Sequence, residues 1–502
     1  MYSTVLSGGI YGIRSYIAKV EVDIARGLPG FDMVGRLSKE VTEARERVRV
    51  ALKNSGIEIP PTRITINISP ANQFKSGTGF DFPIAIGILA AMNYFPPDIL
   101  ENILLIGELG LNGDLCPVHG ILPIISHARD NGIHTCLVPI ANATEAAYVE
   151  GIRIIGITSF TEAVQTLTNL NNAKSFPSPD LCKLIAFQNN KDDFAEVAGQ
   201  EACKRAALIA AAGNHHLMIS GPPGSGKTMI ARRMRTILPA LTTDEILEIS
   251  SLYSIAGKLN EKNPLITVRP FQSPHHATSL PAFLGDRRIL SPGILSLSHK
   301  GILFLDEFPE FSKECIESLR EPLESKTLQL SRANGNYTYP ADFLMVAAAN
   351  PCPCGYFPDR NRCNCTDTEI RRYQNKISGP IRDRIDLTVT SHKIDINHLS
   401  AHKNGPSSED MRKEVLRVRK LQSIRYADYP YNFNSDIPAK DIELFCSLAS
   451  KEFEYASQIY NSMNLSARSY HKLLRVARTI ADLDGSERIR INHLSEAVCY
   501  RG

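Results

Sequence analysis

The sequence predicts a multidomain α/β protein with a mostly helical carboxyl-terminal region. The chain has 502 residues, of which 43% are hydrophobic and 22% are charged, so it can form about three globular units of ordinary composition. Short apolar runs such as 63–69 and 134–140 alternate with helix-like runs such as 40–54, a pattern typical of α/β domains. Beyond residue 395 the pattern is mainly helical.

A polar segment at 169–180, which carries Pro177 and Pro179, is the best candidate for a linker. The expected units are an α/β domain at 1–170, a linker at 171–193, a second α/β domain at 194–395 and a helical domain at 396–502. In the helical domain, the run 411–425 predicts an amphipathic helix with one apolar stripe. The stripe consists of Met411, Val415, Val418 and Leu421.

The first residues do not resemble a secretion signal, because Glu21 and Asp23 fall where its apolar core is needed. The longest apolar run, 82–95, is shorter than the roughly 18 residues that span a bilayer. We therefore expect a cytoplasmic protein with no membrane partner. The net charge of +3 does not by itself indicate binding to nucleic acid.

A glycine-rich loop follows the apolar run at 217–220 and precedes a helix-like run. This is the P-loop pattern in its required context, in which backbone N–H groups and a helix amino terminus surround phosphates. Lys227 is expected to reach the β- and γ-phosphate oxygens and Thr228 to hold Mg²⁺. The expected nucleotide-binding residues are Gly221, Pro222, Pro223, Gly224, Ser225, Gly226, Lys227, Thr228 and Met229.

Polar residues end the next two apolar runs. Asp306 and Glu307 follow the run at 302–305, where Asp306 is expected to orient Mg²⁺ and Glu307 to act as general base on the attacking water. Asn350 ends the run at 344–349 and is expected to position that water beside the γ-phosphate. The alternatives are a solvated strand edge for the acids and a turn-forming Asn before Pro351.

These motifs, with "SGPIRDRIDL" at 378–387 and "NLSARSYHKLLRVARTIADL" at 464–483, resemble the magnesium-chelatase-like AAA+ ATPases. They are most similar to the ComM/YifB group of bacterial proteins, over essentially the whole chain. The resemblance implies an AAA+ P-loop core, a helical lid, the cofactors ATP and Mg²⁺, and a homo-hexameric ring with ATP sites between subunits.

Two arginines acquire expected roles from this resemblance. Arg384 matches the arginine finger that reaches a neighbour's γ-phosphate, and Arg468 matches the sensor-2 arginine of the lid. Arg382 stands where the family pattern has an aliphatic residue, so which of Arg382 and Arg384 crosses the interface stays open. The alternative for Arg384 is an intrachain ion pair with Asp383 or Asp386.

The run 327–343 predicts a strand, an Asn334–Gly335 turn and a second strand. The family places such a hairpin facing the ring pore, where it would contact DNA through backbone contacts and base stacking. The expected contacts are Arg332, Asn336, Tyr337 and Tyr339. The alternative is an ordinary surface hairpin with cross-strand aromatic pairs.

Two further segments are candidate sites. Basic residues gather in the run 411–425 and either form a solvated helix face or neutralise phosphates; they are Arg412, Lys413, Arg417, Arg419, Lys420 and Arg425. The segment 269–293 resembles the helix-2 insert of these motors and contains His275 and His276. We do not favour a metal site there, because no third ligand is near in the sequence.

Four of the eleven cysteines follow Asn350 closely, namely Cys352, Cys354, Cys363 and Cys365. Disulfides are rare in a reducing compartment, so this group predicts one structural Zn²⁺ held by four thiolates. The C-x-C spacing is tighter than the common knuckle, and reduced free thiols are the alternative.

The segment 107–139 resembles the proteolytic domain of Lon, which uses a serine and a lysine. Gly79 aligns with the nucleophile, although Lys75, Ser76 and Thr78 lie close by in the sequence. We therefore expect a Lon-protease-like α/β domain without proteolytic activity.

The leading hypothesis is an ATP-driven hexameric DNA motor, or helicase. The resemblance adds branch migration of recombination junctions during integration of incoming DNA, with recombination proteins as possible partners. The alternatives are an ATP-dependent Lon-like protease, a magnesium-chelatase-type protein-remodelling ATPase, and a non-catalytic nucleotide-binding scaffold. Because fold does not imply function, the ATPase motifs alone do not separate DNA from protein as the substrate.

Overall fold

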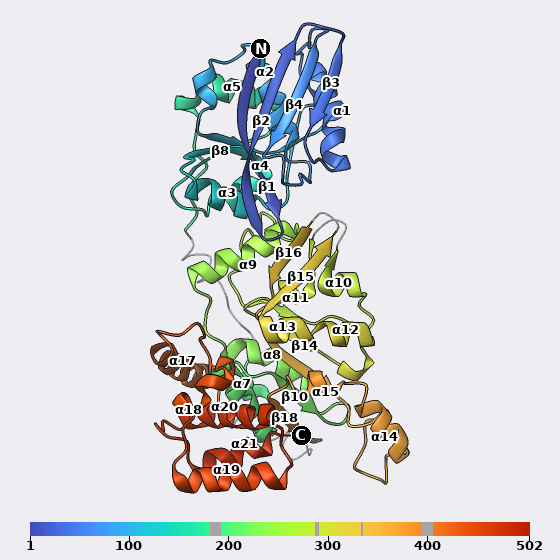
Figure 1. The fold of residues 1–502 in the computed structure, drawn as a ribbon, viewed down its shortest axis with the longest axis vertical. Coiled ribbons are helices and arrows are strands. Elements are labelled where there is room, and N and C mark those ends of the chain that lie inside the picture. Colours follow the sequence, from blue (N-terminus) through green and yellow to red (C-terminus); the bar gives the residue numbers. More distant parts are fainter. Residues whose placement is uncertain (181–191, 287–290, 333–334, 394–404, 502) are drawn as a thin grey trace.

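The computed structural model describes residues 1–180, 192–286, 291–332, 335–393 and 405–501. Figure 1 shows three parts stacked along the long axis: an amino-terminal α/β domain, a central α/β core and a helical carboxyl-terminal region. The expected α/β class with a helical carboxyl-terminal region is therefore confirmed. Within the described ranges, no helix combines the length and apolar character that crossing a membrane requires.

The amino-terminal domain is built on a seven-stranded mixed sheet of order β3-β4-β2-β1-β5-β8-β9. Its strands are β1 (Tyr2–Tyr11), β2 (Arg14–Ala25), β3 (Gly30–Val34), β4 (Arg63–Ser69), β5 (Ile103–Leu105), β8 (Thr135–Pro139) and β9 (Arg153–Ile157), with a small β6 (Glu108–Leu109) and β7 (Leu115–Cys116) ribbon. Its helices are α1 (Lys39–Asn54), α2 (Asp81–Ala91), α3 (Ile121–Asp130), α4 (Ile140–Ala146) and α5 (Phe160–Thr168), with short 3₁₀ turns at Pro97–Leu100 and Leu170–Asn172. The strands and the helix predicted at 63–69, 134–140 and 40–54 are confirmed to within a residue.

The two faces of this sheet belong to different hydrophobic cores. Helices α1, α2 and α5 pack with the sheet into a core of the domain itself. Residues of α3 and α4, such as Ile125 and Ala143, belong to a cluster that also contains Ile249 and Leu303 of the central core. The N–H of Gly120 donates to the carbonyl of Ser254 at 3.0 Å across this boundary. The first domain is therefore packed against the core through shared apolar surface.

The expected linker begins as a segment that stays on the first domain. The N–H of Phe176 donates to the carbonyl of Ile154 at 2.7 Å, and the hydroxyl of Ser178 donates to the carbonyl of Ala147 at 3.2 Å. Residues 181–191 of the expected linker lie outside the described residues.

The core contains a five-stranded, fully parallel sheet of order β11-β14-β17-β10-β18. Its strands are β10 (Leu217–Ser220), β11 (Phe271–Gln272), β14 (Ile302–Leu305), β17 (Leu344–Ala349) and β18 (Leu387–Thr390), and two-stranded ribbons are formed by β12 (Gly285–Asp286) with β13 (Ser291–Pro292) and by β15 (Thr327–Arg332) with β16 (Gly335–Pro340). Its helices are α7 (Glu201–Gly213), α8 (Lys227–Ile237), α9 (Thr243–Ile255), α10 (Leu280–Leu284), α11 (Ile294–Leu297), α12 (Lys313–Ser318), α13 (Arg320–Ser325), α14 (Asp367–Gln374) and α15 (Gly379–Arg382), with 3₁₀ turns at Phe194–Glu196 and Phe308–Glu310. Strands β14 and β17 are apolar and buried along their whole length because cores lie on both faces of the sheet.

The carboxyl-terminal region consists of helices whose apolar sides join the core of the central sheet. They are α17 (Ser408–Arg425), α18 (Ile442–Phe445), α19 (Ser450–Ser462), α20 (Ala467–Leu483) and α21 (Ile491–Cys499), with 3₁₀ turns at Asn434–Asp436 and Ala439–Asp441. In α17, Met411, Val415 and Val418 are buried as predicted. The prediction that Leu421 belongs to the buried stripe was wrong. Its side chain is 40% exposed, and the next buried position is Gln422. The Gln422 side chain can be buried because its amide donates a hydrogen bond to the carbonyl of Ala212 at 2.9 Å.

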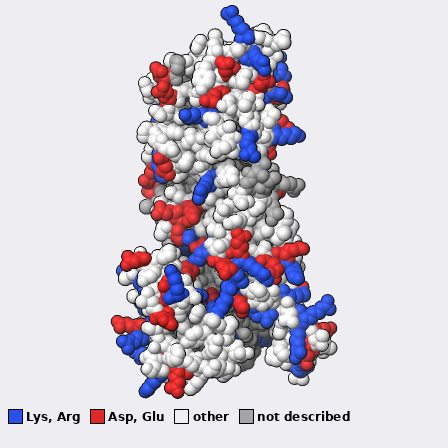
Figure 2. Space-filling model, viewed as in Figure 1, with Lys and Arg blue, Asp and Glu red and all other residues white. Residues whose placement is uncertain are grey.

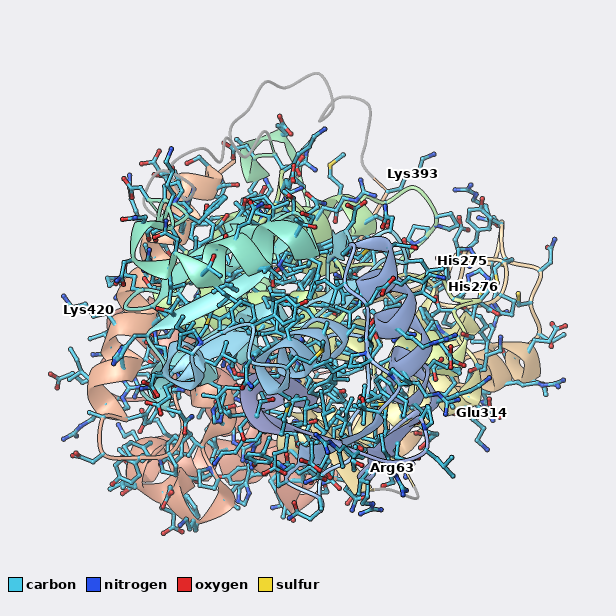
Figure 3. All side chains as sticks on the ribbon, turned by 90° about the horizontal axis from the view of Figure 1, so that it is seen from above. Arg63, His275, His276, Glu314, Lys393 and Lys420 are labelled. Carbon is cyan, nitrogen blue, oxygen red and sulfur yellow. The ribbon has the colours of Figure 1, made fainter. Side chains whose placement is uncertain are left out.

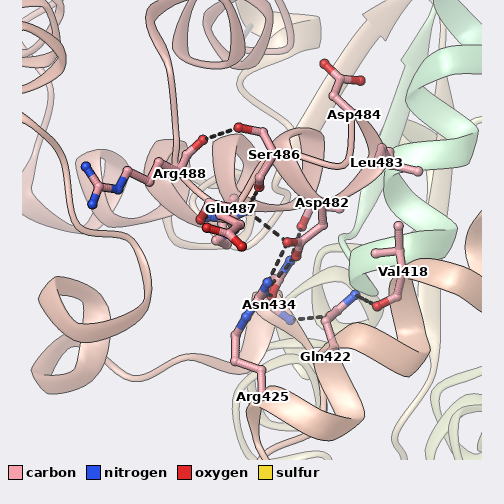
Figure 4. A network of polar contacts seen from close by, with 12 residues as sticks. Val418, Gln422, Arg425, Asn434, Asp482, Leu483, Asp484, Ser486, Glu487 and Arg488 are labelled. Carbon is pink, nitrogen blue, oxygen red and sulfur yellow. Dashed lines mark hydrogen bonds and ion pairs between the residues drawn. The ribbon is translucent and has the colours of Figure 1, made fainter.

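A buried carboxylate joins the helices of this region (Figure 4). Asp482 of α20 accepts hydrogen bonds from Arg425 at 2.6 and 2.8 Å, from Arg478 at 2.9 Å and from the amide of Asn434 at 2.9 Å. The Asp482 side chain is 2% exposed, so its charge depends on these donors. The network fixes α17 against α20.

We expect Asp482→Ala to lower the free energy of unfolding by about 3–5 kcal/mol, because it leaves the Arg425 and Arg478 charges without their buried partner. Chemical denaturation of the purified protein measures this change. Asp484→Ala is the matched control: Asp484 is 38% exposed, so its loss should cost about 1 kcal/mol or less. Equal effects of the two substitutions would contradict the assignment.

Candidate functional site

The sheet order brings the predicted phosphate-site residues together. Strands β14, β17 and β10 are neighbours and parallel, so their carboxyl ends meet at one edge. There the hydroxyl of Thr228, at the start of α8, donates to a carboxylate oxygen of Asp306 at 2.9 Å. Hydroxyl and carboxylate oxygens are ligands that Mg²⁺ prefers, and this pair fits the predicted metal site.

Lys227 lies at the same edge. Its ammonium donates to the carbonyls of Gly221 at 2.7 Å and Pro222 at 3.0 Å, and to the side-chain oxygen of Asn350 at 3.2 Å. Burial lowers the pKa of Lys227 from its ordinary value, while the carboxylates of Asp306 and Glu307 act in the opposite direction. A bound phosphate would favour the charged ammonium. Lys227 and Asn350, which were each predicted to act at the γ-phosphate, thus lie in direct contact.

The loop between β10 and α8 has the conformation that a phosphate cradle requires. Gly224 and Gly226 have φ of 76° and 86°, in the left-handed region that favours glycine. The hydroxyl groups of Ser225 and Ser391 are 2.7 Å apart, which ties the loop to the end of β18. Met229 lies in the first turn of α8 and is 43% exposed.

Glu307, the predicted base, has a partner that the sequence did not indicate. His276 Nδ1 lies 3.3 Å from a carboxylate oxygen of Glu307. His276 also packs on His275, with ring centroids 4.1 Å apart, and Figure 3 shows both histidines on one side of the molecule. The insert at 269–293 therefore contacts the candidate base. Strand β11 carries this contact, since it pairs with β14 and ends four residues before His276.

The two predicted arginines lie together and share one carboxylate. Arg384 forms an ion pair with Glu324 of α13, and Arg468 Nη2 lies 3.8 Å from the other oxygen of Glu324. Arg384 therefore does not pair with Asp383 or Asp386, as the alternative had it. Arg382 instead donates to the carbonyls of Gln374 at 2.8 Å and Ile377 at 3.2 Å. Arg382 stabilises its own loop, whereas Arg384 lines a cavity.

The four clustered cysteines converge in space. The Sγ atoms of Cys352, Cys354 and Cys363 lie 3.4 to 3.7 Å apart, and all four Sγ atoms, with Cys365, lie within 4.8 Å of one another. Four sulfurs at about 2.3 Å from a tetrahedral Zn²⁺ would be separated by about 3.8 Å. The donor set and its spacing therefore fit a metal ion.

The cysteine cluster lies directly against the phosphate-binding loop. Gly355 has φ of 85°, and a Cβ at this position would lie 2.6 Å from Cδ of Pro223. The amide of Gln374 donates to the carbonyl of Pro351 at 3.2 Å, which closes the excursion onto α14. The cluster thus supports the loop that follows β10.

The hairpin β15–β16 forms as predicted, but two of its expected DNA contacts are corrected. Tyr337 and Tyr339 are 1% and 0% exposed, so neither ring is available for base stacking. Tyr337 packs on Tyr11 of the first domain, with ring centroids 4.5 Å apart. Asn336 is exposed. The side chain of Arg332 and the predicted turn residue Asn334 lie outside what the structure describes.

Three of the six basic residues of α17 donate hydrogen bonds to groups on other segments of the chain. Arg417 donates to the carbonyls of Asp482 and Leu483, Arg419 to that of Ala211, and Arg425 to Asp482. Lys420 points outward (Figure 3), and Arg412 and Lys413 are also exposed. On the face drawn in Figure 2, acidic and basic side chains are interspersed. The expected basic helix face is therefore smaller than the sequence indicated.

The first domain does not bring a serine–lysine pair together. Lys75 is fully buried, and its ammonium donates to the carbonyls of Pro70 and Gln73. Thr78 donates its hydroxyl to Glu108. Burial lowers the pKa of Lys75, but its ammonium is bonded to backbone carbonyls, and no serine hydroxyl lies among the described hydrogen-bond partners that it could activate as a general base. The likeness of this domain to Lon stays an expectation.

Comparison with known proteins covers all three parts of the chain. The family model described as magnesium chelatase, subunit ChlI, matches residues 193–399. The model for the C-terminal part of that subunit matches residues 405–501. A third model, described as subunit ChlI of Mg-chelatase, matches residues 20–142. The chain is 38% identical to competence protein ComM of Haemophilus influenzae, over 99% of this chain and 97% of that protein. It is 39% identical to the protein YifB of Escherichia coli, over 98% and 95%. An MCM-type protein of Methanocaldococcus jannaschii is 23% identical over 57% of this chain and 40% of its own length.

We expect Gly355→Ala to weaken nucleotide binding roughly tenfold, which corresponds to about 1.4 kcal/mol. The left-handed backbone costs an alanine about 1–2 kcal/mol, and the new methyl group would displace Pro223. Titration with a fluorescent nucleotide analogue measures the affinity. Gly379→Ala is the control, because a Cβ there meets no atom within 4 Å; unchanged affinity in both variants would show that the cluster does not support the loop.

Proposed function

The chain belongs to the ComM/YifB-type family of magnesium-chelatase-like proteins, and on this basis we propose that it is an ATP-driven ring motor that moves DNA. In this proposal it promotes branch migration of recombination junctions as a homo-hexamer. A relative named for competence and similarity to an MCM-type protein support DNA as the substrate. Recombination proteins are the partners that this activity would require.

One observation supports assembly into a ring: the residues of the candidate ATP site lie in two separate places on one chain. Lys227, Thr228 and Asp306 meet at the edge of the central sheet, whereas Arg384 and Arg468 meet at Glu324. If a neighbour supplies the arginines, each interface holds one complete site. An arginine added to the transition state is worth about 10³-fold or more in rate, so hydrolysis would depend on assembly.

ATP and Mg²⁺ are the cofactors of the proposed reaction. Bound Mg²⁺ would neutralise charge on the β- and γ-phosphates, with Thr228 and Asp306 as the residues that hold it. Glu307 would accept a proton from the attacking water, and Asn350 would orient that water beside Lys227. His276 lies against one carboxylate oxygen of Glu307, so it can influence how this carboxylate is oriented toward the water.

DNA movement is proposed to use the hairpin β15–β16. With Tyr337 and Tyr339 buried, Arg332 and Asn336 are the remaining candidates for contact with the DNA backbone. Such contacts neutralise or bind phosphates and carry no base specificity. We therefore expect binding that depends strongly on salt and little on sequence.

We expect the wild-type protein to move a synthetic four-way DNA junction when ATP is present, measured by gel separation of labelled products. Glu307→Gln should bind ATP but lose hydrolysis and movement by about 10²–10⁴-fold, because an amide cannot accept the proton. The pair Arg332→Ala and Asn336→Ala should reduce movement while basal hydrolysis remains.

Absence of both DNA-stimulated hydrolysis and junction movement at every salt concentration would contradict the DNA motor. A protein-remodelling role, as the magnesium chelatase likeness suggests, would then replace it. Digestion of casein by the wild-type protein would instead favour the protease, although the contacts of Lys75 argue against it.

The four cysteines are proposed to hold one structural Zn²⁺. Elemental analysis of protein purified without chelators should find about one zinc per chain, because four thiolates complete a tetrahedral site. Cys363→Ser should lose the metal, whereas Cys499→Ser, which changes an exposed cysteine outside the group, should retain it. Zinc-free wild-type protein would contradict the site.

A further inference from the structure

A cavity of about 720 Å³ lies between the base of the hairpin, the segment after α15 and the helical region. It contains more positive than negative side chains. Its six cationic residues are Lys326, Arg384, Lys440, Arg468, Lys472 and Arg475, and its four carboxylates are Glu324, Asp342, Asp386 and Asp436. The described residues that line it do not include the phosphate-binding loop. An excess of cations around a cavity favours an anionic ligand.

Helix α20 supplies one wall of the cavity. Arg468, Lys472 and Arg475 are spaced at i, i+4 and i+7, so they lie on one face of the helix. The ammonium of Lys472 donates to the carbonyl of Ile385 at 2.8 Å and lies 3.8 Å from Asp386. Ile385 directly follows Arg384, and Lys472 lies one helical turn after Arg468. This hydrogen bond therefore keeps Arg384 and Arg468 close together.

The arginines of the cavity are only partly satisfied by the chain. The Nε atoms of Arg384 and Arg475 are buried and make no hydrogen bond to any described residue. Burial lowers the pKa of the Arg475 guanidinium. Buried donors without partners are uncommon because they cost free energy, so these two point to a ligand with several acceptor oxygens.

Within one chain, the carboxylate of Glu324 forms ion pairs with both Arg384 and Arg468. Its side chain is 61% exposed, so water or a stronger anion can replace it. It lies on α13, one residue from the end of that helix and three residues before β15 begins. Glu321 of the same helix accepts a hydrogen bond from the backbone N–H of Gln329 in β15 at 3.1 Å. The helix that carries Glu324 is thus attached to the hairpin.

We propose that Glu324 is the resident counter-ion of Arg384 and Arg468, and that a triphosphate presented by a second copy of the chain displaces it. This inference rests on the proposed function, in which the ATP site lies between subunits. A triphosphate supplies more negative charge and more acceptor oxygens than one carboxylate, so it is the stronger partner for two guanidinium groups. Because Glu321 of the same helix bonds the backbone of Gln329, this displacement takes place beside the hairpin of the same subunit.

The test is ATP hydrolysis measured without DNA, as a function of ATP and protein concentration. Glu324→Gln keeps the shape of the side chain and removes the competing charge. We expect it to lower KM for ATP by about threefold, the effect of one exposed ion pair of this kind, and to lower the protein concentration for half-maximal hydrolysis. Glu317→Gln is the control, because Glu317 pairs with Arg320 on the neighbouring helix and with neither interface arginine.

An unchanged or raised KM in folded Glu324→Gln would overturn the proposal, because a merely structural acid would give that result. If Glu324→Gln does not fold, Glu324→Asp replaces it: the shorter acid cannot span both arginines and should give part of the same decrease. In the Arg384→Ala/Arg468→Ala background the substitution should have no effect on nucleotide affinity. Because DNA is omitted, failure of the DNA-motor proposal leaves these outcomes unaltered.

Discussion

The hydrogen bond between Thr228 and Asp306 depends on a single constraint, the parallel arrangement of β10, β14 and β17. In a parallel sheet the carboxyl ends of neighbouring strands lie at one edge, so residues 78 positions apart come within 2.9 Å. Lys227 and Asn350 meet for the same reason, across 123 positions. Any change that slips one strand against the next would separate all of these groups at once.

Packing transmits this arrangement to the rest of the molecule. One face of the central sheet shares its core with the helical region, and the other shares its core with the first domain and the hairpin. The packing of Tyr337 on Tyr11 belongs to the second core. A movement of the hairpin therefore disturbs the contact between domains, and the first domain is in a position to limit that movement. The cysteine cluster acts in a similar way on the phosphate-binding loop, because Gly355 packs against Pro223.

Much of the fold and the candidate site could be predicted from the sequence. The apolar runs before Gly221, Asp306 and Asn350 became neighbouring strands, and the four cysteines converged. The errors concern side chains whose environment is set by distant segments. Polar and aromatic residues alternate along β16 in the same way whether a hairpin is exposed to solvent or covered by another domain. This pattern therefore did not indicate that Tyr337 and Tyr339 would be buried. In α17, Gln422 occupies the apolar stripe because Ala212 and Asn434 supply its hydrogen bonds.

The sequence by itself determined the order of the motifs along the chain, the conformation of the glycine-rich loop, and which residues form the candidate phosphate site and the cysteine cluster. These features depend on local residue types and short spacings, which backbone sterics and hydrogen bonding translate directly into structure. Only the tertiary structure decided that Arg384 and Arg468 share Glu324, that Arg382 binds its own loop and that His276 faces Glu307. The ion pairs among these contacts join residues 31 to 144 positions apart, and which charges meet is set by the packing of whole elements rather than by any pattern within one of them.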